Sequence, residues 1–123
     1  KTPIFLPSVA NFYQGMIVNL PLHSDLLNNN FTFKDVENVI RDQYESCKFV
    51  KIKSHNDSIS NLGFFRPDKV INTNNLYINI FKNEKNNQMV LSSNFDNLGK
   101  GASSAAIQCM NLVFGFSEDV SLN

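Results

Sequence analysis

The stretch from Asp96 to Gly115 constrains the fold most, because a polar loop runs directly into a helix there. The loop reads Asp-Asn-Leu-Gly-Lys-Gly-Ala over residues 96–102. Small and apolar side chains then recur three or four residues apart, which places them on one stripe of a helix: Ala102, Ala105, Ala106, Cys109, Met110 and Val113. Gly115 stands where a helix commonly ends in a left-handed residue. Spacing alone leaves two interpretations open. The segment is a core helix after an ordinary turn, or its small face and unpaired first amides lie against an anion or a cofactor.

The remaining chain alternates short apolar segments with polar, asparagine-rich loops. One helix is expected over residues 33–46, since Thr32 and Asp35 approximate a capping box before an apolar stripe. Pro21 and the polar residues after it are expected to end the first strand. Four strands are predicted, over residues 16–20, 49–53, 76–81 and 88–93.

The connections between these elements indicate the fold class. Residues 82–87 form a short polar link, so the last two strands are predicted to be a hairpin. Residues 55–69 read as a long loop, and residues 70–71 are expected to pair briefly. This order predicts an α+β domain with a mixed or antiparallel sheet and helices on one face.

Length and composition limit the classes of function. A chain of 123 residues makes one domain with a modest core. Acidic and basic side chains balance at eleven each, so charge does not point to nucleic acid or an anionic membrane, and the apolar runs are too short to span a bilayer. Cys47 and Cys109 have no ligand spacing, which excludes a zinc motif and indicates reduced thiols in an intracellular protein. The start at Lys1 is typical of a piece of a longer chain.

No catalytic set is visible in the residues. His23 directly precedes a serine and an aspartate, but neighbours in one loop cannot reach the geometry of a triad. His55 is expected to be solvated. Cys47 follows a helix, whose dipole disfavours a thiolate there, and Cys109 lies on the apolar stripe, where burial disfavours it. No glycine-rich phosphate-binding motif occurs.

Residues 96–115 closely resemble the signature D-N-L-x-K-G-A-x-x-Q-A-x-Q-x-x-N-x-x-F-G of the N-acetyl-gamma-glutamyl-phosphate reductases. Residues 2–16 look like the T-P-x-L-x-x-N-F-x-R-G-I/M segment of the same family, and residues 68–74 look like its K-x-V-x-G-T/S-N stretch. The helix and strand expected over residues 33–53 fall where this family has them. The resemblance therefore covers nearly the whole chain in register.

The resemblance implies a division of labour between two domains. Enzymes of this family have an N-terminal Rossmann domain that binds NADP and a second α+β domain of the glyceraldehyde-3-phosphate dehydrogenase kind. Residues 1–123 are then the substrate-binding and dimerisation domain, and the Rossmann domain precedes Lys1. The family's catalytic cysteine and histidine also lie upstream, so neither role passes to a residue of this chain. No metal is implied.

The activity implied is reduction of N-acetyl-glutamyl 5-phosphate to the 5-semialdehyde in arginine biosynthesis, in a cytoplasmic homodimer or homotetramer. The 123 residues alone are expected to have no reductase activity and to bind NADP weakly at most. Self-association is expected to run through the sheet.

The same resemblance places site residues on two segments. Those facing the cofactor are Asn97, Leu98 and Gly101, and those on the substrate side are Asn11, Gln14 and Gly15. The stripe on residues 102–113 is expected to pack against the Rossmann domain.

Two positions depart from the family pattern. Gln14 stands where the family commonly has arginine, and Ala105 stands where it has glutamine. These departures leave three alternatives open. The parent protein acts on an N-succinyl or a carrier-linked aminoadipyl substrate, it is an aspartate-semialdehyde dehydrogenase, or the chain is a non-catalytic oligomerisation module.

Overall fold

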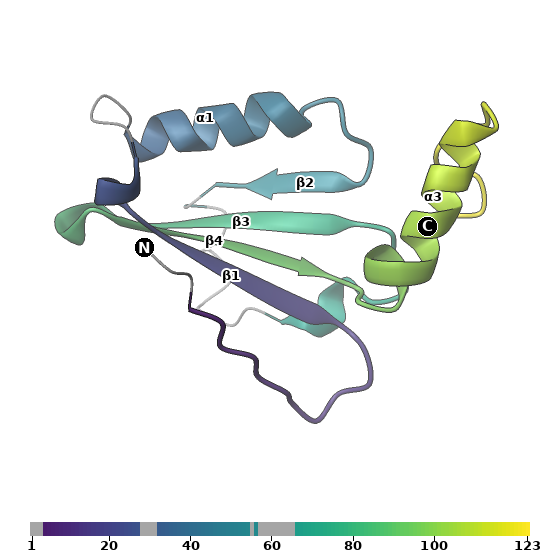
Figure 1. Cartoon of the computed structure of the whole chain (residues 1–123), viewed down its shortest axis with the longest axis horizontal. Helices are drawn as coiled ribbons and strands as arrows, with labels where there is room; N and C mark the ends of the chain where they lie inside the picture. Colours follow the sequence, from purple (N-terminus) through teal and green to yellow (C-terminus); the bar gives the residue numbers. More distant parts are fainter. Residues whose placement is uncertain (1–3, 28–31, 55, 57–65) are drawn as a thin grey trace.

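The computed structural model describes residues 4–27, 32–54, 56 and 66–123 (Figure 1). Four strands form one sheet in the order β1-β4-β3-β2. Strand β4 runs antiparallel to both of its neighbours, whereas β2 runs parallel to β3. The predicted α+β class with a mixed sheet is confirmed. The strands are β1 (Met16–His23), β2 (Val50–Lys53), β3 (Leu76–Asn83) and β4 (Gln88–Phe95).

The hairpin of β3 and β4 forms where it was predicted, and both strands are two residues longer than expected. The link contains one 3₁₀ turn, η3 (Glu84–Asn86). The side chain of Asn83 accepts a hydrogen bond of 3.2 Å from the N–H of Asn86. Asn87 closes the turn with φ of 51°, a left-handed conformation that asparagine adopts more readily than most residues.

Strand β1 continues through Pro21 to His23, so the prediction that Pro21 ends the strand is wrong. The reason is the position of β1 at the edge of the sheet, where β4 is its only partner among the residues that the structure describes. An edge strand needs N–H donors on one side only, so it tolerates a proline that a central strand would not. The turn η1 (Ser24–Leu26) follows the strand.

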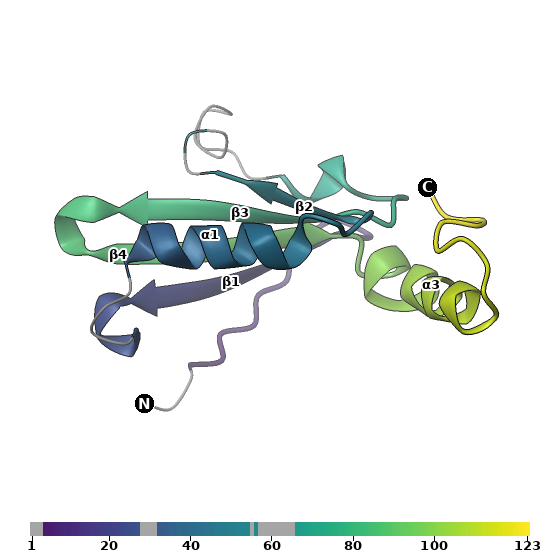
Figure 2. The ribbon, with the colours of Figure 1, turned by 90° about the horizontal axis from the view of Figure 1, so that it is seen from above.

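Helix α1 (Phe33–Tyr44) covers one face of the sheet (Figures 1 and 2). The predicted capping box is present: the N–H of Asp35 donates to Thr32 Oγ1 at 3.3 Å, and the N–H of Thr32 donates to Asp35 Oδ2 at 2.7 Å. The small core lies between this helix and the sheet and contains Phe33, Ile80 and Met89, with Leu22, Leu27, Val36, Ile52 and Leu91 packed around them.

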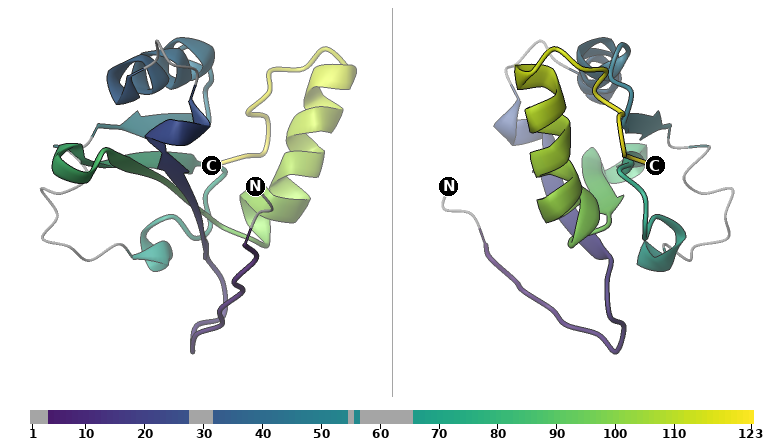
Figure 3. Two further views of the ribbon diagram at one scale, coloured as in Figure 1. Left: turned by 60° about the vertical axis from the view of Figure 1, so that its left-hand side comes forward. Right: turned by 90° about the vertical axis from the view of Figure 1, so that its right-hand side faces the viewer.

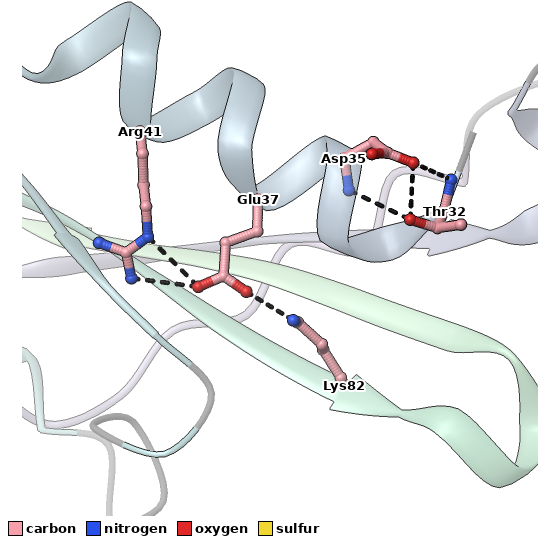
Figure 4. A network of polar contacts seen from close by, with 5 residues as sticks. All are labelled: Thr32, Asp35, Glu37, Arg41 and Lys82. Atoms are coloured by element: carbon pink, nitrogen blue, oxygen red, sulfur yellow. Dashed lines mark hydrogen bonds and ion pairs between the residues drawn. The ribbon is translucent and has the colours of Figure 1, made fainter.

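Glu37 joins α1 to the sheet through a polar contact at the margin of this core (Figure 4). Its carboxylate accepts from Arg41 Nη2 at 3.1 Å on the same helix and pairs with Lys82 of β3. Burial alone raises the pKa of Glu37, but the hydrogen bonds from Lys82 and Arg41 outweigh it, so this pKa lies below its ordinary value.

The predicted loop over residues 55–69 falls mostly outside the described residues, as does the asparagine run at 28–30. The described end of the loop forms the 3₁₀ turn η2 (Pro67–Lys69). Residues 70–71 form no strand, contrary to expectation. The N–H of Val70 instead donates to Pro67 O, and its side chain is buried.

Helix α3 (Ser104–Val113) stands beyond the end of the sheet and not on the face that α1 covers (Figures 2 and 3). A π-helical turn, η4 (Gly99–Ser103), leads into it from β4. Gly115 follows the helix with φ of 74°, as the sequence predicts. In the described part of the chain, no helix is long and apolar enough to cross a membrane.

Candidate functional site

The two predicted groups of site residues meet at one end of the sheet. Met16 begins β1 and Phe95 ends β4, and these two residues are partners in the antiparallel ladder. The residues just before β1 therefore lie beside those just after β4. The N–H of Gly15 donates to Asn97 Oδ1 at 2.7 Å, which joins the predicted substrate side to the predicted cofactor side.

Asp96 is the centre of this contact, and its side chain is buried with 2% exposure. Its Oδ1 accepts from the N–H groups of Leu98 and Gly99, both at 2.9 Å. Its Oδ2 accepts from Gln14 Nε2 at 2.9 Å and from the N–H of Asn72 at 2.8 Å. One carboxylate thus holds three segments of the chain together.

The electrostatic state of Asp96 follows from these partners. Burial alone raises its pKa, but the hydrogen bonds from Gly99, Asn72, Leu98 and Gln14 outweigh burial and lower the pKa below its ordinary value. The carboxylate is therefore ionised at neutral pH. The N–H groups of Leu98 and Gly99, in the loop before the helix, are thus already paired with this carboxylate.

Two glycines permit this close packing. A Cβ at Gly99 would lie 3.1 Å from Asp96 Cγ, so a side chain there would push the carboxylate away. Gly15 has φ of 109°, and a Cβ there would lie 3.1 Å from Pro67 Cβ. Larger residues at either position would strain the contact between the two segments.

Asn72 is the third member of the cluster, and sequence reasoning did not identify it. Its backbone is left-handed with φ of 59°, and its Oδ1 accepts from Gln14 Nε2 at 3.0 Å. A signal was present, because Asn72 occupies the position of the glycine in the K-x-V-x-G-T/S-N pattern. Glycine and asparagine share tolerance of positive φ.

An open pocket of about 390 Å³ adjoins the cluster. Its lining is mainly polar and includes Gln14, Asn72, Asn74, Asp96, Ser104 and Ser121. Leu98 also lines it and is 45% exposed. Of the other predicted site residues, Asn11 and Gly101 are exposed, and neither lines the pocket.

The inward face of α3 is polar. Gln108 Oε1 accepts from Asn74 Nδ2 at 3.0 Å and from Lys100 Nζ at 2.7 Å, and Gln108 Nε2 donates to Glu118 at 2.9 Å. Burial is the main reason that the pKa of Lys100 is lowered, although Glu118 opposes the shift. The bond from Asn74 docks the helix on the body of the domain, whereas those with Lys100 and Glu118 join it to the turn before it and to the C-terminal segment after it.

A second set of contacts holds the C-terminal segment, residues 114–123, against α3. Asn111 is 1% exposed, and its Nδ2 donates to the carbonyl oxygens of Glu118 at 3.3 Å and Val120 at 2.9 Å. The carbonyl of Asn123 accepts from the N–H of Asn74 at 2.6 Å. The C-terminal segment thereby forms part of the pocket wall.

The predicted apolar stripe of α3 points outward. Cys109 is exposed, so the prediction that burial protects its thiol is wrong for this chain. Met110 and Val113 are exposed as well, the latter by 80%, and only Ala105 of the stripe is half-buried. The helix is therefore not a core helix of this domain. The polar residues Ser104, Gln108 and Asn111, spaced four and three apart, were the available signal for its inward face.

Groups with reactive side chains are scattered. Cys47 is exposed beyond the end of α1, and His23 is exposed at the end of β1. His55 lies outside the described residues. Within residues 4–27, 32–54, 56 and 66–123, no three His, Cys, Asp or Glu side chains are grouped so that they could hold a metal ion.

The chain matches a known class of domain. The family model described as the semialdehyde dehydrogenase dimerisation domain matches residues 1–97. The chain belongs to this family, which confirms the resemblance drawn from the sequence.

Three curated relatives carry the same enzyme name. The chain is 36% identical over 122 residues to the N-acetyl-gamma-glutamyl-phosphate reductase of Trichormus variabilis. It is 35% identical to N-acetyl-gamma-glutamyl-phosphate reductase 2 of Nostoc sp.. Each alignment covers 98% of this chain and 38% of the relative. The reductase of Burkholderia cenocepacia is 32% identical over 115 residues, which are 94% of this chain and 36% of that protein. The chain thus spans a little over a third of these relatives.

Proposed function

We propose that this chain is the substrate-binding and dimerisation domain of a longer, cytoplasmic, NADPH-dependent reductase. The reaction converts N-acetyl-glutamyl 5-phosphate, NADPH and a proton into N-acetyl-glutamate 5-semialdehyde, NADP⁺ and phosphate. The observation that carries the proposal is the alignment of 98% of the chain with proteins named N-acetyl-gamma-glutamyl-phosphate reductase. In this proposal a Rossmann domain upstream of Lys1 binds most of the cofactor and supplies the nucleophilic cysteine.

The loop of residues 97–101 fits the uncharged dihydronicotinamide end of NADPH better than the phosphates of the cofactor. The N–H groups of Leu98 and Gly99 are already bonded to Asp96, and this ionised carboxylate would repel a phosphate. Leu98 and Gly101 are exposed on the loop and could lie against a planar ring. Asn97 uses its side-chain oxygen to hold Gly15, so its role in this proposal is to orient the loop.

NADPH would supply the hydride when it is bound, and the chain would supply the surface that receives its reactive end. The outward stripe of α3 supports the same arrangement, because Met110 and Val113 are exposed and a preceding domain would cover them. Gln14 and Gly15 hold the segment before β1 at this surface, where the substrate side is proposed.

The test is an assay of the full-length protein that contains this chain. With N-acetylglutamate 5-semialdehyde, NADP⁺ and phosphate, we expect phosphate-dependent formation of NADPH, and no activity from residues 1–123 alone. Aspartate semialdehyde offered in its place separates the proposal from its nearest alternative. Turnover of aspartate semialdehyde alone would assign the protein to that other dehydrogenase, and the absence of turnover with both would refute the proposal.

Cysteine variants provide a control within this chain. Cys47→Ser and Cys109→Ser should each keep the activity of the full-length protein, because the proposed nucleophile lies upstream of Lys1. Loss of turnover in either variant, with folding intact by circular dichroism, would move the nucleophile into this chain and contradict the proposal.

We further propose that the protein forms a homodimer or homotetramer through the sheet. Val18 and Leu20 are exposed on the edge strand β1, by 47% and 54%, which is unusual for large aliphatic side chains in a strand. The double variant Val18→Lys and Leu20→Lys should shift the full-length protein toward the monomer in sedimentation velocity. The matched double variant of two exposed α1 residues, Lys34→Glu and Asp42→Lys, should leave the oligomeric state unchanged.

A further inference from the structure

We propose that Gln14 is a positioning residue that fixes the loop of residues 97–101 through Asp96, and that it does not bind the substrate. This inference rests on the proposed function, because its readout is the kinetics of the full-length reductase. In this inference the residue at position 14, glutamine here and commonly arginine in the family, serves to hold the cofactor-side loop in place.

The donors of Gln14 are fully used inside the protein. A side-chain amide carries two N–H hydrogens. Gln14 Nε2 lies 2.9 Å from Asp96 Oδ2 and 3.0 Å from Asn72 Oδ1, so each hydrogen has an acceptor. No amide hydrogen is left to donate to the carboxylate or the phosphate of a substrate.

The acceptor of Gln14 is the group that shapes the loop. Asp96 Oδ1 accepts from the N–H groups of Leu98 and Gly99, while Asp96 Oδ2 accepts from Gln14. The carboxylate is a rigid plane, so its orientation is shared by both sets of donors. A change at Gln14 is therefore transmitted to the main chain at residues 98 and 99.

Loss of the Gln14 donor leaves Asp96 Oδ2 with one donor fewer. Asp96 is 2% exposed. A buried carboxylate that loses a hydrogen-bond donor is still removed from water, so the unfavourable free energy of desolvation is no longer offset by that bond. The loop must then reorient to recover a partner. An arginine at position 14 would present a cation to the same oxygen atoms, which explains how the two residue types can serve one role.

The experiment measures both substrates of the full-length enzyme in a double-mutant cycle. Gln14→Met keeps the length of the side chain and removes its donors. We expect this variant to raise the KM for NADPH about tenfold, the effect of about 1.4 kcal/mol, and to leave the KM for the acyl phosphate within about twofold. Gln14→Arg should restore a KM for NADPH close to that of the parent enzyme.

The second arm repeats both substitutions with Asp96→Asn. In that background Gln14→Met should have little further effect and Gln14→Arg should rescue nothing, because the acceptor that transmits the change is lost. If Asp96→Asn fails to fold, Asn72→Gly replaces it. That substitution removes the second acceptor of Gln14 and keeps a residue that tolerates φ of 59°. Because the hydrogen bond from Gln14 to Asp96 remains in that background, Gln14→Met should keep its full effect, and a loss of the effect would assign the role of Gln14 to Asn72 and overturn the inference.

Gln88→Met is the control, because Gln88 is exposed at the far end of β4. It should leave both KM values unchanged. The inference is overturned if Gln14→Met raises the KM for the acyl phosphate and not that for NADPH. It is also overturned if the effects of the Gln14 and Asp96 substitutions are additive.

The experiments distinguish a failure of this inference from a failure of the proposed function. A parent enzyme with no turnover refutes the proposed function. The parent protein, Gln14→Met and Gln14→Arg can then be titrated with NADPH by fluorescence, and equal affinity in all three would refute the role of Gln14 as well.

Discussion

Asn111 carries the attachment of the C-terminal segment, because its side-chain nitrogen donates to two main-chain carbonyls there. Asn111→Leu keeps a similar volume and removes both hydrogen bonds. The 2.9 Å bond to Val120 and the longer 3.3 Å bond to Glu118 together contribute about 2 kcal/mol, at about 1 kcal/mol for each net hydrogen bond. That free energy corresponds to about a 30-fold larger opening equilibrium for the segment.

Amide hydrogen exchange measures this opening residue by residue. The N–H groups of Val120 and Leu122 each donate within the C-terminal segment, to Ser117 and Asp119. Their exchange should be about 30-fold faster in Asn111→Leu, because they are protected only while the segment is docked. Amides in the hairpin of β3 and β4 should exchange as before.

Asn111→Asp sharpens the test, because it places carboxylate oxygens against the same two carbonyls. The acceleration relative to the parent protein should be larger at pH 7 than at pH 4, since a protonated carboxyl can donate one bond and an ionised one cannot. Cys109→Ser, on the exposed side of the helix, is the control and should change nothing. An acceleration below about threefold in Asn111→Leu, or an equal one in β4, would refute the attachment through Asn111.

Three further predictions concern the fold around the site. Gly15→Ala should destabilise the protein by about 2 kcal/mol, because φ is 109° and the new Cβ would lie 3.1 Å from Pro67 Cβ. The expected measurement is a fall in Tm of several degrees, and an unchanged Tm would contradict the prediction. Thr32→Ala should cost about 1 kcal/mol in urea unfolding through loss of the cap on α1 (Figure 4), whereas Thr32→Ser should not. Glu37→Gln should flatten the acid limb of the stability curve. The folded-state pKa of Glu37 lies below its ordinary value of 4.5, so the contribution of its pair with Lys82 is present above pH 4.5 and is lost as the pH falls through the folded-state pKa. Equal slopes for parent and variant between pH 3 and 5 would contradict that assignment.

Elements with local signals were predictable from the sequence. The capping box at Thr32, the hairpin link before Gln88 and the left-handed Gly115 each depend on residues a few positions apart. Their physical causes act within one turn of the chain, so the pattern of side chains determines them.

The centre of the candidate site was not predictable in the same way. Gln14 and Asp96 are 82 residues apart, and they meet because β1 lies at the edge of the sheet beside β4. That strand order places β1 next to the last strand and not next to β2, a choice that no local spacing encodes. Pro21 was misread for the same reason, since its cost depends on whether the strand is central or at the edge.

The orientation of α3 required a different kind of information. Its apolar stripe was visible in the sequence, and a stripe normally faces the core of the same domain. In this chain the stripe faces outward and the polar residues Gln108 and Asn111 face inward. The family resemblance predicts an external partner for the stripe, and this stays a prediction, whereas the periodicity alone predicts none.

Docking α3 through polar contacts has a consequence for how the two parts of such a protein can be joined. Hydrogen bonds such as those of Gln108 depend on direction and distance, so they restrict the angle at which the helix can lie. The angle of this helix is therefore set by the domain itself before anything covers Met110 and Val113. A surface that packs on this stripe meets side chains whose backbone is already ordered, so less conformational entropy is lost when the two join.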